Sequence, residues 1–295
     1  MSITNPFADN APTDLEDRTL VTRARSGNRE ALEMLVRRHQ GWIYNIAVRM
    51  LYHPQDAEDA TQEILIKAVT RLSSFEGRSS FRTWLYRIVV NHVLNMKRGR
   101  VEQTPISFRS YGQELDNTPD LDLPDPSSVP ADVHLLVAEA MIACVSGMLL
   151  CLDREQRLTY VLGEIFGLSD TVAAELLEIS GENFRQRLAR ARRELHNFMN
   201  DKCGLVNREN PCRCAKKTRG FIQAGHVDPE HLLFAHDHIQ QVREVVPQAY
   251  KAIRTLDDQY ADIYRQHPFY EAPDLVPMLR RLFESPDFRR TTEFI

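Results

Sequence analysis

The chain of 295 residues carries 37 Lys and Arg against 41 Asp and Glu, which gives a net charge of −4. That length allows two or three small domains with buried cores, and the scarcity of glycine favours helices throughout. An odd number of cysteines, five, in a chain without an apolar N-terminal stretch argues against secretion and for a reducing cytoplasm. The most apolar run, residues 137–152, contains Glu139 and Gly147 and is too short for a membrane span, so no membrane insertion is expected.

Residues 14–100 are predicted to form a first helical domain after a disordered lead, residues 1–13. His53-Pro54 separates a long amphipathic helix from the next helix, in which Ala57 faces inward. The outward face of that next helix is either simply solvated or a docking surface for a protein partner. Its polar members are Asp59, Gln62, Glu63 and Lys67.

A basic and aromatic segment, residues 75–100, ends this domain. Phe81 and Leu85 belong to one helical face, whereas cations and amides recur every three or four residues on another. Cations suit phosphates, amides suit base edges, and aromatic rings stack on unpaired bases. The alternative is an amphipathic helix with a solvated positive face, and Trp84 fits core packing as well as stacking. The candidate DNA-binding residues are Arg82, Tyr86, Arg87, Asn91, His92, Asn95, Lys97 and Arg98.

The composition changes sharply over residues 101–132, where seven acidic residues accompany five prolines and only Arg109 is basic. Such a stretch buries too little apolar surface to fold alone. It is predicted to be a flexible acidic linker.

A helix-turn-helix is predicted within the second domain, residues 133–202. Ser169 and Ser180 are candidate N-caps, although the turn between the two helices lacks the frequent glycine. The longer helix buries Phe184 and the apolar residues that follow it at four-three spacing, so its opposite face is free to enter a major groove. An arginine-rich surface helix without a DNA partner is the alternative. The candidate base-reading residues are Arg185, Gln186, Arg190 and Arg193.

The segment 203–225 brings three cysteines within twelve residues. No cofactor is required by the rest of the sequence, but Zn²⁺ is a candidate here because it takes four thiolate or imidazole ligands. A redox role is the second reading, since Arg213 and Lys217 would lower the thiol pKa values, and a plain structural loop is the third. Cys144 and Cys151 are expected to be core thiols. The candidate metal ligands are Cys203, Cys212, Cys214 and His226.

The last segment, residues 226–295, is predicted to be a helical extension. An amphipathic stripe from Val242 to Ile263 must pack on something, either the upstream domains or a partner. No phosphate loop, nucleophile elbow or pair of carboxylates in a credible pocket is recognisable, so an enzyme is not expected.

Several phrases of the sequence resemble one known family in the right order. The chain resembles bacterial RNA polymerase sigma factors of the extracytoplasmic function group over about two thirds of its length. The matching phrases are Asp56-Ala57-Glu58-Asp59-Ala60-Thr61-Gln62-Glu63, Phe81-Arg82-Thr83-Trp84-Leu85-Tyr86-Arg87-Ile88-Val89-Val90-Asn91, Asp153-Arg154-Glu155-Gln156-Arg157 and Arg187-Leu188-Ala189-Arg190-Ala191-Arg192.

The resemblance implies an all-α protein: two small helical domains, the second a helix-turn-helix, joined by the acidic linker and followed by a helical extension. It implies binding of core RNA polymerase through the Asp59 face, of the promoter minus-ten element through the first domain, and of the minus-thirty-five element through the second. The linker would thread the polymerase cleft, or act as a mere tether. Control would come from an anti-sigma protein or from the extension, and we expect a chain cut after Met199 to initiate without regulation. The alternatives are a helix-turn-helix repressor and a metal- or redox-sensing DNA-binding regulator that act without polymerase.

Overall fold

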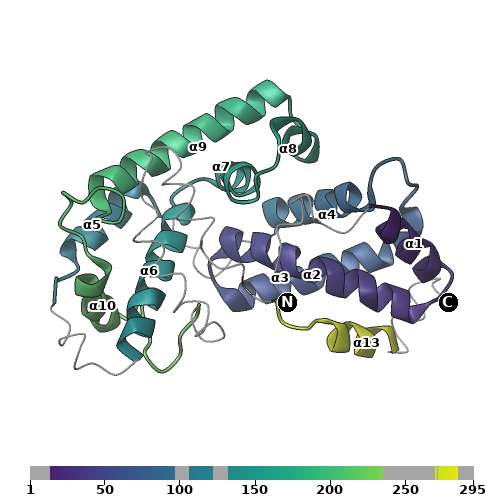
Figure 1. The fold of residues 1–295 in the computed structure, drawn as a ribbon, viewed down its shortest axis with the longest axis horizontal. Coiled ribbons are helices and arrows are strands. Elements are labelled where there is room, and N and C mark those ends of the chain that lie inside the picture. The colour runs from purple at the N-terminus through teal and green to yellow at the C-terminus, as the bar shows by residue number, and fades with distance from the viewer. Residues whose placement is uncertain (1–13, 97–105, 122–131, 235–269, 271, 285–295) are drawn as a thin grey trace.

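The computed structural model describes residues 14–96, 106–121, 132–234, 270 and 272–284, and these residues contain helices and no strand. The expected all-α class is therefore confirmed over the described residues. Figure 1 shows α1 to α4 gathered in one half of the molecule and α5, α6, α9 and α10 in the other, with α7 and α8 between them.

The first half consists of α1 (Asp14–Arg25), α2 (Arg29–Leu51), α3 (Pro54–Thr70), a 3-10 turn η1 (Leu72–Ser74) and α4 (Phe81–Asn95). Each of the three longer helices begins at a residue whose side chain accepts a backbone N–H, which satisfies an otherwise unpaired donor. These caps are Asn28, His53 and Ser80. The core of this half is built on α2, where Trp42 stacks on Tyr86 of α4 with ring centroids 4.1 Å apart.

A helix interrupts the acidic segment that the sequence predicts to be flexible. Helix α5 (Phe108–Asn117) begins with a reciprocal capping pair between Ser107 and Ser110, and Phe108 packs its ring on Phe198 of α9 at 5.2 Å. Tyr111 donates its hydroxyl hydrogen to the Cys144 carbonyl oxygen over 2.8 Å. The prediction of a flexible linker is wrong for this stretch, because Phe108, Tyr111 and Leu115 find a hydrophobic surface to cover.

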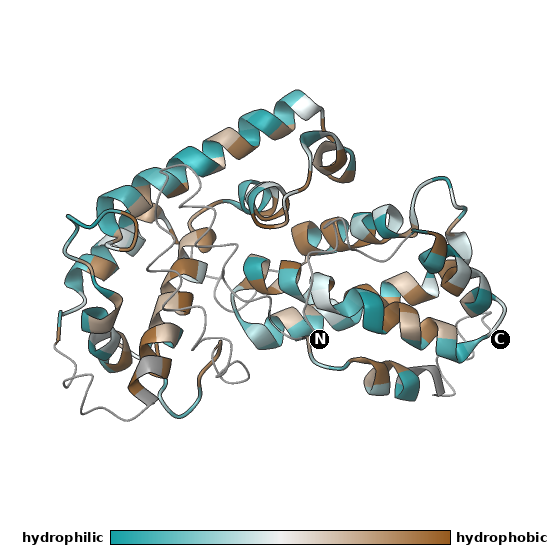
Figure 2. Ribbon diagram, viewed as in Figure 1, coloured by the Kyte–Doolittle hydropathy of each residue, from teal (hydrophilic) through white to brown (hydrophobic). Residues whose placement is uncertain are grey.

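The second half contains α6 (Asp132–Leu150), α7 (Arg154–Tyr160), a π-helical turn η3 (Val161–Ile165), α8 (Asp170–Leu176), α9 (Gly181–Lys202) and α10 (Cys214–Gln223). Helices α8 and α9 form the predicted helix-turn-helix, with Ser169 and Ser180 as its N-caps. The turn places Glu178 at φ +55°, the left-handed conformation that glycine usually supplies. Figure 2 shows that the outward side of α9 is largely hydrophilic.

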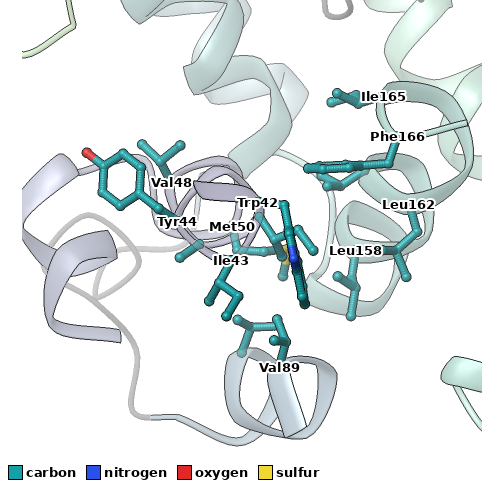
Figure 3. Packing of buried hydrophobic residues seen from close by; sticks show 14 of the residues in the cluster. Trp42, Ile43, Tyr44, Val48, Met50, Val89, Leu158, Leu162, Ile165 and Phe166 are labelled. Carbon is teal, nitrogen blue, oxygen red and sulfur yellow. The ribbon is translucent and has the colours of Figure 1, made fainter. Parts of the chain in front are cut away.

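The two halves share one continuous hydrophobic cluster rather than two separate cores. Figure 3 shows where they meet: side chains of α2 and α4 face those of α7 and η3, among them Trp42, Ile43, Met50, Val89, Leu158, Leu162 and Phe166.

Two arginines of α7 join the same halves through backbone carbonyls. Arg154 donates to the Met96 carbonyl oxygen at 2.7 Å, just past the end of α4. Arg157, which is 3% exposed, donates to the carbonyl oxygens of Met50 at the end of α2 and of Leu149 at the end of α6. Its guanidinium therefore binds the negative ends of two helices that belong to different halves.

The far C-terminal part of the chain returns to α2. Tyr270 exchanges two backbone hydrogen bonds with the Asn45 side chain, at 2.8 and 2.9 Å, and α13 (Val276–Glu284) follows it along α2. Arg37 pairs with Asp274 at 2.8 Å. The amphipathic stripe predicted around residues 242–263 lies outside the described residues. No helix in the described parts of the chain is long and apolar enough to cross a membrane.

Candidate nucleic-acid interface

Helix α4 presents only part of the surface that the sequence predicts. Asn91 and Asn95 are exposed, and Arg82 and Arg87 are half-buried. The Asn95 amide donates to the Asn91 carbonyl oxygen at 2.9 Å. The described face therefore carries two exposed amides and two half-buried guanidinium groups.

Two predicted DNA-binding residues are instead part of the core. Tyr86 is completely buried against Trp42, and burial raises the pKa of its hydroxyl far above the usual value. His92 is 6% exposed. Both predictions are wrong for this arrangement, because the side chains continue the buried stripe that begins at Phe81. Trp84 is half-buried between the rings of Phe75 and Phe81, at 5.6 and 5.5 Å.

His92 connects α4 to the predicted polymerase-docking face of α3. Lys67 places its Nζ 2.7 Å from Nδ1 of His92, and Glu63 lies 3.8 Å from Nε2. Burial, followed by the charge of Lys67, lowers the pKa of His92, so the neutral ring accepts a hydrogen bond from the lysine. On this face Asp59 and Glu63 are exposed, whereas Gln62 and Lys67 are half-buried. Lys97 and Arg98 lie outside the described residues.

Helix α9 carries its four predicted base-reading residues on the exposed side. Arg185 pairs with Asp170 of α8 at 2.7 Å, which orients the guanidinium across the helix-turn-helix. Gln186 donates to Glu182 at 3.1 Å. The buried residues Phe184, Leu188, Ala191, Leu195 and Phe198 match the predicted spacing.

An ion pair that the sequence did not predict links the two candidate surfaces. Arg87 of α4 pairs with Glu175 of α8 at 3.0 Å, and α4 packs against α8. Because Arg87 and Glu175 are 88 positions apart, no periodicity in the sequence predicts their contact. The Arg87 guanidinium is thus held by the helix-turn-helix in this arrangement.

Among the candidate metal and redox residues, His226 and the three cysteines have different surroundings. His226 pairs with Glu114 at 2.8 Å. Burial raises the pKa of each of the three cysteines, and outweighs the lowering effect of Arg213 on all three and of Lys217 on Cys212. The expected low-pKa thiols are therefore not observed, since the cations oppose a larger desolvation effect.

The chain is similar to several known RNA polymerase sigma factors. The family model for sigma-70 region 2 matches residues 35–102. The RNA polymerase sigma-H factor of Pseudomonas aeruginosa is 31% identical over 180 residues, 61% of this chain and 92% of that protein. The ECF RNA polymerase sigma-E factor of Escherichia coli K12 is 32% identical over 195 residues, 62% of this chain and 94% of that protein. The solved structure of CnrH in complex with the cytosolic domain of CnrY is 28% identical, with a TM-score of 0.44 over 63% of this chain and 97% of that one.

These relatives place the all-α chain, with its helix-turn-helix in the second half, in the class of transcription initiation factors. Specifically, the chain belongs to the RNA polymerase sigma factors of the ECF group. Sigma-factor function is supported over the repressor and sensor alternatives.

Proposed function

We propose that this sigma factor binds core RNA polymerase and directs it to promoters that its two halves recognise separately. Helix α3 docks on the polymerase through Asp59, Gln62, Glu63 and Lys67. Helix α4 contacts the minus-ten element and α9 reads the minus-thirty-five element. The observation that carries the proposal is the pairing, in one chain of the sigma family, of the polar face of α4 with a helix-turn-helix whose Arg190 and Arg193 are exposed.

The chemistry of the two DNA surfaces suits different forms of the duplex. On α9, guanidinium groups and an amide project from a straight helix, which suits base edges in a major groove. On α4, Arg82 and Arg87 suit phosphates, and Asn91 and Asn95 suit exposed base edges. We assign no catalytic step to the protein, because bond formation belongs to the polymerase, and we place its action in the cytoplasm with that partner.

The ion pair between Arg87 and Glu175 gives the free chain a closed arrangement. The half-exposed Arg87 guanidinium is engaged by Glu175, so DNA must compete with this ion pair for it. The contacts of Tyr270 and α13 with α2 support control by the chain's own extension, rather than by a separate anti-sigma protein alone.

Transcription with purified components tests the proposal. Core polymerase that is inactive alone at a candidate promoter is expected to initiate when this chain is added. Arg190→Glu is expected to reduce initiation by more than about tenfold, because it places a carboxylate where a base edge or phosphate lies. Arg208→Glu, at an exposed cation beyond α9, is the matched control. Failure of the wild-type chain to initiate with active polymerase contradicts the proposal.

A further inference from the structure

The guanidinium of Arg185 on α9 is held in one direction by α8. Its Nη1 atom pairs with Oδ2 of Asp170 at 2.7 Å. The other oxygen of Asp170 accepts the backbone N–H of Thr171 at 2.9 Å, so the carboxylate is itself fixed to the start of α8. The guanidinium lies over the first turn of α9, because a Cβ added at Gly181 would be 3.5 Å from its Nη1.

This pair fixes Arg185 without hiding it. The side chains of Arg185 and Asp170 are 62% and 41% exposed, so the guanidinium stays accessible. A guanidinium has five N–H donors, and Asp170 engages it through one nitrogen. The donors that remain are enough for the two parallel hydrogen bonds by which arginine recognises O6 and N7 of guanine.

Gln186 is held in the same way by a carboxylate on its own helix. Its Nε2 donates to Oε1 of Glu182, one turn earlier on α9, at 3.1 Å. A carboxylate accepts only from the nitrogen of the amide, so this contact fixes which end of the amide is which. The second N–H and the amide oxygen remain, and these are the groups that pair with N7 and N6 of adenine.

The two other base-reading candidates on α9 lack such partners. Arg190 and Arg193 are exposed, and in the parts of the chain that the structure describes no side chain pairs with either. Both lie further along α9 than Arg185, whereas a recognition helix contacts base edges with its N-terminal residues. A mobile cation suits phosphates, since these contacts need charge and carry no sequence information.

We infer that Asp170 is a positioning residue, which presets Arg185 to read a guanine in the minus-thirty-five element. Glu182 does the same for Gln186 and an adenine, while the unpartnered arginines further along α9 bind phosphates. A side chain that is already ordered loses less freedom on binding, which is equivalent to about two- to tenfold in affinity for each one. The inference rests on the proposed function, in which α9 enters a major groove.

Base preference, rather than affinity alone, distinguishes a positioning role from a structural one. Holoenzyme assembled from core polymerase and the full chain is mixed with a randomised double-stranded DNA library, and the bound DNA is sequenced. Arg185→Ala identifies the position at which guanine is preferred. Asp170→Asn keeps an oxygen for the Thr171 N–H but loses the charge that holds Arg185. It is expected to lower the guanine preference at that position by about three- to tenfold and to leave the other positions unchanged.

Two matched variants complete the test. Asp201→Asn removes the same charge from an exposed position at the far end of α9, and it is expected to keep the wild-type preferences. Arg193→Gln is expected to weaken binding to all sequences alike and to reduce the slope of log affinity against log salt concentration by about one. Because a preference is a ratio measured within one variant, partial unfolding does not imitate a change at a single position.

The outcomes separate this inference from the proposed function. Unchanged guanine preference in Asp170→Asn or in Arg185→Ala, or an equal loss in Asp201→Asn, overturns the positioning role while promoter recognition stands. A base-specific change in Arg193→Gln contradicts its assignment to phosphate. A wild-type holoenzyme that enriches no sequence contradicts the proposed function, and this inference with it.

Discussion

Arg87 is the residue at which the closed arrangement and the DNA surface compete. Its guanidinium pairs with Glu175 at 3.0 Å, and both side chains are about half exposed, so the pair contributes only up to about 1 kcal/mol. Glu175→Gln is expected to raise affinity for labelled promoter DNA by up to about fivefold at low salt, and less at high salt. Fluorescence anisotropy at two salt concentrations measures this.

Removing any acidic side chain raises the affinity for DNA by reducing electrostatic repulsion. The effect of Glu175→Gln must therefore be compared with that of a second substitution that removes the same charge elsewhere. Glu209→Gln, at an exposed position in the loop after α9, supplies that control. In a double-mutant cycle, the gain in DNA affinity from Glu175→Gln is expected to disappear when Arg87 is already replaced by Gln. Equal gains from Glu175→Gln and Glu209→Gln would show that the ion pair does not restrain Arg87.

His92 makes the stability of the first half depend on pH. Burial and the Lys67 charge lower its pKa in the folded chain, so below about pH 6.5 the unfolded chain binds a proton that the folded chain does not. This contribution is complete above that pH and is lost as the pH falls toward the folded pKa. His92→Gln is expected to flatten the acid side of the profile by up to about 1.4 kcal/mol per pH unit.

Urea unfolding between pH 5 and pH 8 checks that slope. His39 also has a pKa lowered by burial, so part of the acid-side loss remains in the variant. Asn91→Gln, at an exposed position next to His92, removes no titratable group; it is the control and should leave the slope unchanged. An identical slope in wild type and His92→Gln would contradict the assigned shift.

At the scale of the element, the helix-turn-helix contains a local strain at Glu178. A side chain at φ +55° brings its Cβ too close to the backbone, at a cost of about 1–2 kcal/mol. Glu178→Gly is expected to raise the free energy of unfolding by about 0.5–1 kcal/mol. Glu178→Ala removes the same carboxylate but keeps the Cβ, so it should give no such gain in a denaturant titration. A stability gain shared by both variants would point to charge instead of conformation.

Helices could be predicted from the sequence where caps and apolar spacing lie within the helix itself. Caps and apolar spacing define α8 and α9, and the buried residues of α9 follow from a period that the chain displays directly. Contacts between distant segments carry no such signal. Tyr86 was assigned to the surface because its stacking partner Trp42 lies on another helix.

The acidic segment 101–132 is a second case in which contacts with distant residues could not be predicted from the sequence. Its composition predicts disorder, yet α5 is held by Phe198, Lys202 and α6. Gly147 allows this, because a Cβ there would come within 2.7 Å of the Tyr111 hydroxyl oxygen. A surface provided by the rest of the fold, and not the segment's own apolar content, decides whether it is helical.

At the scale of the whole molecule, the described residues beyond Met199 pack on two different parts of the fold. Residues 203–234 complete the second half: α10 covers α6, and the buried Glu139 carboxylate accepts the N–H groups of Leu233 and Phe234 at 2.8 and 3.0 Å. Residues 270 and 272–284 lie instead along α2 of the first half. The expectation that a cut after Met199 removes only regulation does not suit this division.

Two truncations separate these roles. A chain ending at Met199 is expected to lose about 2–4 kcal/mol of stability, because α6 loses its apolar cover and Glu139 loses two donors. A chain ending at Phe234 keeps both of these contacts and loses only those of Tyr270 and α13 on α2, so it is expected to lose less stability than the Met199 chain. It is also expected to bind core polymerase several-fold more tightly, because α13 no longer covers α2, which packs beside the docking helix α3. Thermal unfolding and polymerase affinity, measured on both chains and on the full protein, check this. Equal stability of the two truncations would mean that α10 is dispensable, and unchanged polymerase affinity of the Phe234 chain would mean that α13 does not obstruct docking.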